Sequence, residues 1–260
     1  MDLRMKQFVV LGLIIAALAG CSSKSYVETS EGLSEKTVDL PAAAKSRLTL
    51  ALKYVEIENY QEAKINLDRA SSYEPDNADI HLAYAYYHQK VKENEHAEKA
   101  YRKALKLAPN DGNINNNYGV FLCGVKRFDE AEKQFLAAIS APFYNAISNS
   151  YENAGQCALE QGNKDRALKY LQSSLAHAPQ NLNVRLTLAE LNYELANYKV
   201  AQQQLIKYES VAKATARSLW LGFNIAQKQD NSAVAEVYSR QLLAQFPLAL
   251  QTQKYITNDY

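Results

Sequence analysis

The feature that most constrains the fold of this 260-residue chain is a motif that recurs about every 34 residues. Pro75 and Pro109 lie 34 residues apart, and Pro179 ends a later copy. An alanine lies twelve residues before each proline, and a small residue lies five residues before it. A bulky residue lies four residues after each of these alanines. The alanines are Ala63, Ala97 and Ala167, the small residues Ala70, Ala104 and Ser174, and the bulky residues Leu67, Tyr101 and Leu171. This period predicts a stack of supersecondary units that bury their apolar faces against one another.

Three further copies keep part of the motif, so that six repeats begin near residues 44, 78, 112, 148, 182 and 215. Small residues let two antiparallel helices approach, and the bulky residue fills the space toward the next pair. The period resembles that of tetratricopeptide repeats. We therefore expect an all-α fold over residues 42–260, an α-solenoid of about six helix pairs with a concave face. The partial copies are Ala131, Phe135 and Ala138 with Pro142 one residue early; Ala201, Leu205 and Tyr208; and Trp220-Leu221-Gly222 with Ala235 and Phe246-Pro247.

The composition agrees with helices and excludes several classes of function. Hydrophobic residues make up 47% of the chain and charged residues 22%, which is enough to bury a core. Nine Gly and six Pro leave few turn signals for a β-sandwich. Because 29 Lys and Arg balance 28 Asp and Glu, the chain lacks the basic excess that nucleic-acid binding requires.

The N-terminal segment is typical of a secretory signal peptide. Arg4 and Lys6 precede an apolar run of eleven residues, 8–18. This run is too short to cross a bilayer as a helix, which takes about 20 residues, and it has the three-part form of a signal peptide. We expect residues 1–20 to be this signal peptide.

The junction Leu18-Ala19-Gly20-Cys21 resembles the lipobox of bacterial lipoproteins. The resemblance implies that Cys21 carries a diacylglycerol and becomes the N-terminus after cleavage; the alternative is a plain signal peptide followed by a chance cysteine. Because Ser22 stands where the inner-membrane retention signal has Asp, it also implies sorting to the outer membrane, facing the periplasm. Residues 21–41 are rich in Ser, Thr, Glu and Lys and are expected to be the lipidated Cys and a flexible tether, with an additional short helix as the alternative.

The chain shows no pattern typical of an enzyme. It contains no G-x-S-x-G, G-x-G-x-x-G, P-loop or H-E-x-x-H motif. His81 and His88 lie seven residues apart and could share a helix face as metal ligands, but they occupy positions where the repeat carries aromatic packing residues. His96 and His177 lie near turns and add no argument for a site. We expect no catalytic residue, metal, cofactor or small-molecule substrate.

Two cysteines remain once Cys21 is lipidated. Cys123 and Cys157 lie 34 residues apart, on the leading helices of consecutive repeats. Disulfides persist in an oxidising periplasm, so the pair predicts one intramolecular bridge. Two buried, reduced thiols are the alternative.

The first repeat carries more apolar residues than one packing stripe needs. The packing positions of its leading helix are filled by Leu50, Ala51 and Tyr54. Other apolar residues, at i, i+4, i+7 spacing, are therefore expected to face the concave side of the solenoid. The predicted partner-binding groove consists of Leu48, Leu52, Val55, Leu82, Tyr86, Asn113 and Asn116. The alternative is that the tether folds back over this strip.

The sequence of the central repeats points to one group among the proteins with tetratricopeptide repeats. They read Asn116-Asn117-Tyr118-Gly119-Val120-Phe121-Leu122-Cys123, then Phe128-Asp129-Glu130-Ala131, Pro142-Phe143-Tyr144 and Glu152-Asn153-Ala154-Gly155-Gln156-Cys157-Ala158, with Leu219-Trp220-Leu221-Gly222 in the last repeat. With the lipobox, this resembles the PilF/PilW family of type IV pilus biogenesis lipoproteins. It departs from the family in lacking an acidic C-terminal ending and in carrying His81 where an aromatic residue is common.

The resemblance implies a non-enzymatic outer-membrane pilotin, which helps secretin subunits to reach the outer membrane and assemble there, or stabilises pili. The implied partners are the secretin subunit and the membrane that holds the lipid. The alternative is a general scaffold lipoprotein of another envelope machine, such as outer-membrane barrel assembly or peptidoglycan synthesis.

Overall fold

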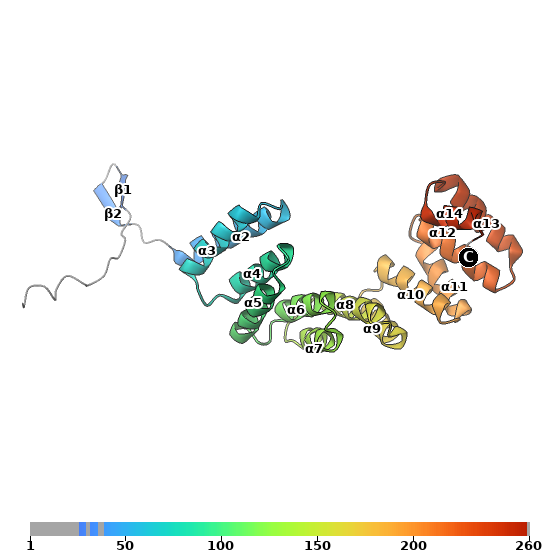
Figure 1. Ribbon diagram of the computed structural model, residues 1–260, viewed down its shortest axis with the longest axis horizontal. Coiled ribbons are helices and arrows are strands. Elements are labelled where there is room, and N and C mark those ends of the chain that lie inside the picture. Colours follow the sequence, from blue (N-terminus) through green and yellow to red (C-terminus); the bar gives the residue numbers. More distant parts are fainter. Residues whose placement is uncertain (1–25, 30–31, 36–38, 259–260) are drawn as a thin grey trace, which may run out of the picture.

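The computed structural model describes residues 26–29, 32–35 and 39–258, and most of these residues lie in helices. Twelve helices form six consecutive antiparallel pairs (Figure 1). The expected all-α solenoid is confirmed. The pairs are α2 (Leu40–Glu56) with α3 (Tyr60–Tyr73), α4 (Ala78–Lys90) with α5 (Asn94–Leu107), α6 (Gly112–Gly124) with α7 (Phe128–Ile139), α8 (Ile147–Glu160) with α9 (Lys164–His177), α10 (Leu182–Glu194) with α11 (Tyr198–Glu209), and α12 (Ala216–Lys228) with α13 (Ser232–Gln245).

The leading helices begin at residues 40, 78, 112, 147, 182 and 216. Only the first lies more than one residue from its expected start, near 44. The extra turn begins at Asp39, whose side chain accepts a hydrogen bond from the Ala42 amide, and Pro41 occupies the first turn. Both features favour helix initiation, because a capping carboxylate satisfies a free N–H and proline has none to satisfy.

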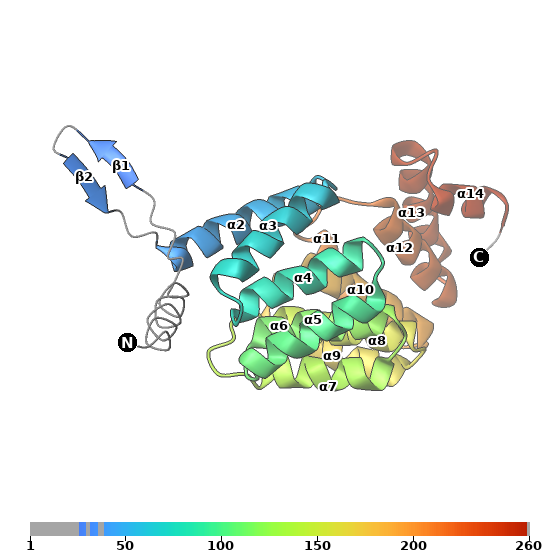
Figure 2. The same cartoon turned by 60° about the vertical axis from the view of Figure 1, so that its left-hand side comes forward.

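The repeat motif builds the core as the spacing predicts. The alanines Ala63, Ala97, Ala131, Ala167 and Ala201 are fully buried where the two helices of each pair meet. The bulky residues four positions later are buried as well, and each pair packs against the next along the chain (Figures 1 and 2). The stack therefore holds one continuous series of apolar contacts instead of a single central core.

A seventh unit, unexpected from the sequence, closes the C-terminal end of the stack. The short helix α14 (Leu250–Ile256) packs against α12 and α13. Its Tyr255 ring meets Phe223 of α12 edge-on, with 5.2 Å between ring centroids, and the buried Thr252 hydroxyl donates to the Phe246 carbonyl at 2.6 Å. These contacts cover part of the apolar face that a terminal repeat leaves open.

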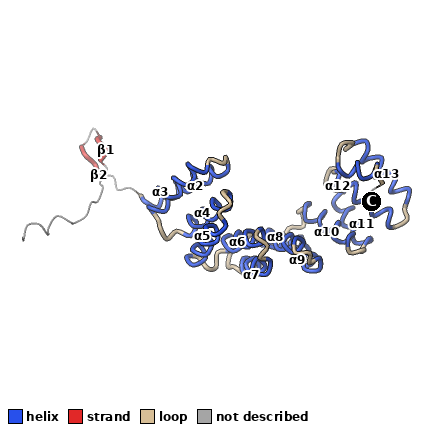
Figure 3. Tube along the Cα trace, viewed as in Figure 1, coloured by secondary structure: helices blue, strands red, loops and turns tan. Residues whose placement is uncertain are grey.

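Part of the predicted tether lies within the described residues. β1 (Tyr26–Thr29) and β2 (Gly32–Glu35) pair as an antiparallel hairpin, with Tyr26 opposite Glu35 (Figure 3). Tyr26, Val27 and Thr29 are aromatic or β-branched, and such residues favour extended backbone. The predicted signal peptide and Cys21 lie outside the described residues, and within those residues no helix is both long and apolar enough to span a bilayer.

Candidate functional site

A cavity of about 640 Å³ opens between the leading helices of the first three repeats. A cavity of this size is in the range of sites that bind small molecules or the anchoring side chains of a peptide. Its walls come from α2, α4 and α6, with one residue of α5 at its floor. The lining residues are Leu52, Asp79, Leu82, Ala83, Tyr86, Gln89, Lys90, Tyr101, Asn117 and Val120. We call this cavity the groove.

The floor of the groove is the buried side chain of Tyr101. Tyr101 is only 2% exposed and stacks on Tyr118 at 5.1 Å between ring centroids. Its hydroxyl donates to Oε1 of Gln89 at 2.6 Å, which fixes the amide that faces the groove. Burial raises the pKa of Tyr101 well above its ordinary value, so this hydroxyl stays protonated as a donor.

The rim combines an exposed apolar surface with charges of both signs. Val120 is 44% exposed and so offers an apolar surface at the rim. Lys90 Nζ lies 5.2 Å from the centroid of the Tyr86 ring, a cation–π distance, and the Asp79 carboxylate lies on the same wall. The groove can therefore hold apolar side chains at its centre and pair with polar groups at its edge.

Three of the seven predicted groove residues, Leu52, Leu82 and Tyr86, line the cavity. Two others on α2 do not. Leu48 packs into the apolar contacts between the first two repeats, and Val55 is only 2% exposed, so its assignment to the groove is wrong. Val55 instead occupies a packing position, while Leu50, expected in such a position, is 36% exposed.

The predicted asparagines also lie outside the cavity. Asn113 is exposed on α6 without lining it. Asn116 Oδ1 accepts hydrogen bonds from Ser150 Oγ at 2.9 Å and Asn153 Nδ2 at 3.0 Å, which joins α6 to α8. The residues that α6 contributes are Asn117 and Val120, which the sequence reasoning missed. The signal that could have pointed to this surface is Val120, an apolar residue off the packing stripe of α6.

The two cysteines meet between the third and fourth repeats. Cys123 on α6 and Cys157 on α8 face each other with their Cα atoms 5.8 Å apart, within the range that a bridge needs. Both are buried in the contacts around Phe121 and Phe135. They lie outside the groove and connect its third helix to the next repeat.

A charged cluster joins the second repeat to the third on a different surface. Glu98 of α5 accepts hydrogen bonds from Arg127 at 2.8 Å, Arg102 at 2.7 Å and Tyr118 at 3.1 Å. Desolvation raises the pKa of the Glu98 carboxyl, but these hydrogen bonds outweigh it and lower the pKa to about 2. The cluster holds α5 against α6 through Tyr118 and against the start of α7 through Arg127.

Comparisons with known proteins connect this architecture to a family. The tetratricopeptide repeat family model matches residues 42–199. The chain is 30% identical over 246 residues to the type IV pilus assembly protein PilF of Pseudomonas aeruginosa, covering 94% of this chain and 95% of that protein. A solved structure of P. aeruginosa PilF superposes with a TM-score of 0.72 at 30% identity, over 85% of this chain and 100% of that one.

The structure of PilW, a type IV pilus biogenesis factor, superposes with a TM-score of 0.70 at 32% identity, over 82% of this chain and 98% of that one. YrrB, a tetratricopeptide protein with an unusual peptide-binding site, superposes with a TM-score of 0.61 over 74% of this chain and 97% of that one. Its 17% identity shows a shared fold alone.

Proposed function

Because the chain belongs to the tetratricopeptide-repeat family of type IV pilus biogenesis proteins represented by PilF and PilW, we propose that it is a non-enzymatic assembly factor for the pilus. In this proposal it acts as a pilotin, binding a segment of the outer-membrane secretin subunit in the groove. The apolar groove on the first three repeats is the observation that carries the proposal. A fold alone does not assign a function, so the argument rests on this site.

The chemistry of the groove indicates the kind of segment that fits. Leu52, Leu82 and Val120 offer apolar contacts, and Gln89 and Asn117 offer hydrogen bonds at the edge. A helical or extended peptide that docks in such a groove is held by a few apolar anchors. We therefore expect a secretin segment with two or three apolar side chains on one face.

The N-terminal segment supports a location at the outer membrane, facing the periplasm. Lipidation at Cys21 would hold the solenoid at the membrane where secretin subunits assemble. Several acyl chains matter, because one chain alone gives only marginal membrane binding. The same compartment is oxidising, and the geometry of Cys123 and Cys157 supports a disulfide there.

Two substitutions test the groove without disturbing the core. Leu48 is unsuitable because it packs between repeats, whereas Tyr86 and Val120 line the groove outside the buried core. The variant Tyr86→Ser with Val120→Asp is expected to fold and reach the membrane, yet to lose secretin multimers and surface pili. The matched control is Leu136→Asp, because Leu136 is 43% exposed on α7 and does not line the groove.

Secretin multimers can be followed by gel electrophoresis without boiling, and pili by shearing them from cells. A groove variant that is present at the wild-type level and gives normal multimers would contradict the proposal. Loss of multimers in both the groove variant and Leu136→Asp would attribute the effect to folding instead of binding. A groove variant that keeps its secretin multimers but loses another envelope assembly would favour a general scaffold.

A further inference from the structure

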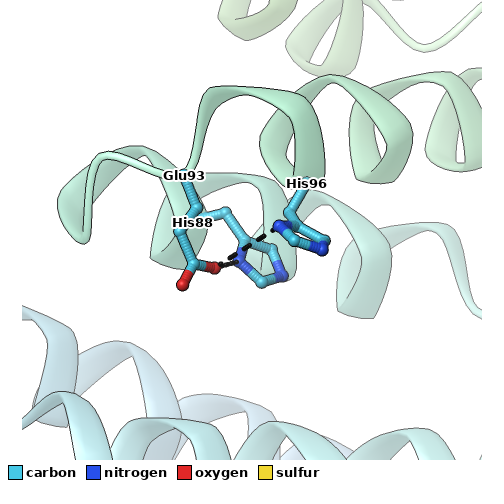
Figure 4. Close-up of side chains that lie close together, drawn as sticks. All are labelled: His88, Glu93 and His96. Atoms are coloured by element: carbon cyan, nitrogen blue, oxygen red, sulfur yellow. Dashed lines mark hydrogen bonds and ion pairs between the residues drawn. The ribbon is translucent and has the colours of Figure 1, made fainter.

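Three side chains with metal-binding atoms meet at the turn of the second repeat. His88 lies in the last turn of α4, Glu93 precedes α5, and His96 lies in the first turn of α5 (Figure 4). Nδ1 of His88 lies 2.8 Å from Oε2 of Glu93, and Nδ1 of His96 lies 3.7 Å from the same oxygen. The three possible ligand atoms all lie within 4.8 Å of one another.

These distances approach those of a metal centre. Zinc binds imidazole nitrogen and carboxylate oxygen at about 2.0–2.2 Å, so ligand atoms around a tetrahedral ion lie roughly 3.3 Å apart. The widest separation therefore has to close by on the order of 1.5 Å. The Glu93 and His96 side chains are 51% and 67% exposed, and such side chains can make this adjustment by rotating.

The Glu93 carboxylate is turned toward the histidines rather than toward its own helix. Glu93 is the N-cap residue of α5, yet its side chain caps no N–H of that helix. The corresponding residues Asn59, Asn163 and Asn231 of other repeats each accept a hydrogen bond from their helix. Capping is the usual role of a polar residue at this position, and the second repeat lacks the cap that the first, fourth and sixth repeats have; the N-cap residues Arg127 of α7 and Asn197 of α11 lack it as well.

His88 is the fixed member of the group. Its side chain is only 14% exposed, and its ring packs edge-on against Tyr87 at 5.1 Å and stacks on Tyr84 at 6.2 Å. The His96 ring stacks on the His88 ring, with 5.2 Å between ring centroids. One ligand is thus held in place while the other two remain adjustable. His81 lies outside the group because its Nε2 lies 2.8 Å from the Pro75 carbonyl oxygen.

We propose that His88, Glu93 and His96 form a binding site for a divalent first-row transition metal ion, with Zn²⁺ as the ion to test. Two imidazoles and one carboxylate suit Zn²⁺, whereas Mg²⁺ and Ca²⁺ require oxygen ligands. Three protein ligands leave the fourth position for water or for a group from a partner.

Metal binding would join the end of α4 to the start of α5. Gln89 and Lys90, in the same last turn of α4 as His88, line the groove. A metal ion at the turn would therefore stiffen one wall of the groove. This inference concerns the ion alone and does not depend on which partner the groove binds.

Calorimetric titration of the full chain with ZnCl₂ tests the site, using protein without a histidine tag and with free thiols alkylated. We expect one saturable equivalent of Zn²⁺ and a rise in the unfolding temperature, because a ligand that binds the folded state stabilises it. MgCl₂ is expected to give neither effect. The variants His96→Ala and Glu93→Gln change exposed side chains, so both are expected to fold, which circular dichroism can check.

Each variant should weaken Zn²⁺ binding by more than roughly tenfold. Removing a residue that only orients a metal ligand already lowers metal affinity by about tenfold or more, and a ligand itself should matter at least as much. His177→Ala is the control, because His177 is an exposed histidine on α9 that stacks on Tyr151 and lies outside the group. Absence of saturable binding, or equal binding by wild type and both variants, would overturn the proposal and leave only hydrogen bonds to the Glu93 carboxylate.

Discussion

Substitution by alanine is expected to have opposite effects on stability at two glycines of α6, Gly119 and Gly124. A Cβ atom added at Gly119 would lie 2.7 Å from Cδ1 and Cε1 of Phe135 on the partner helix α7. A Cβ added at Gly124, in the last turn of α6, would meet nothing within 4 Å. Because both residues belong to one helix, Gly124→Ala is a matched control for Gly119→Ala.

The magnitudes follow from two competing effects. Replacing glycine by alanine inside a helix gains about 0.5–1 kcal/mol of stability. At Gly119 the new methyl group has to displace the ring of Phe135, which is 1% exposed and packed in the core. Overpacking of this kind costs about 1–3 kcal/mol, and contacts below 3.0 Å favour the upper part of that range. Gly119→Ala is therefore expected to destabilise by about 1–2 kcal/mol net.

Urea unfolding followed by circular dichroism at 222 nm measures both effects. Stacked repeats can unfold in several steps, so the comparison uses the midpoint of the transition of each variant against wild type. Gly119→Ala should lower the midpoint, and Gly124→Ala should leave it unchanged or raise it slightly. A Gly119→Ala variant as stable as Gly124→Ala would refute the claim that close approach of α6 and α7 requires a glycine.

Three further predictions concern bonds and charges. Cys123 and Cys157 should leave no free thiol between them in unreduced, denatured protein, and breaking their loop of about 34 residues should cost roughly 4 kcal/mol in the chain-entropy model. The pKa of Glu98 is lowered from its ordinary value of 4.5 to about 2, so the ionised carboxylate stabilises the folded state fully above pH 4.5. The stability of the fold should therefore decrease as the pH drops from 4.5 toward 2. Glu98→Gln should weaken this pH dependence in acid unfolding. Cys21→Ser should remove the protein from outer-membrane fractions, and unchanged fractionation would argue against lipidation at this cysteine.

The sequence predicted the helix pairs because their determinants are local and repeated. Ala97 with Tyr101 and Ala131 with Phe135 keep one spacing, and the structure buries each of these residues at a contact between helices. Few arrangements other than stacked pairs can bury such a pattern. The terminal helix α14 lacks this pattern, since its sequence matches no part of the repeat, and it was not expected.

The rotation of α2 about its axis could not be predicted in the same way. Leu48, Leu50, Leu52 and Val55 cover more than one face, so periodicity alone leaves several choices for the buried stripe. The structure buries Val55 and exposes Leu50, because the stripe that faces α3 also has to include the small residue Ala51. Packing against α3 decides the rotation, and this moved the groove residues by a few positions.

The histidine group was missed because its members belong to two helices. His88 precedes Glu93 by five residues across a turn, and only Glu93 and His96 keep a spacing that a single helix brings together. His88 and His81 share the spacing of one helix face, whereas the turn brings His88 next to His96. The geometry of the turn, which the repeat determines, supplied the missing information.

The groove is the surface that we propose binds the secretin subunit, and the proposed function depends on this contact. A photo-crosslinking amino acid placed at Val120 in cells, with Leu136 as a matched exposed position on α7, tests this contact directly. After irradiation, antibodies against the secretin subunit should detect a covalent adduct from position 120 and none from position 136. An adduct from position 136 alone, equal adducts from both positions, or no secretin adduct from position 120 in cells that assemble pili would contradict it.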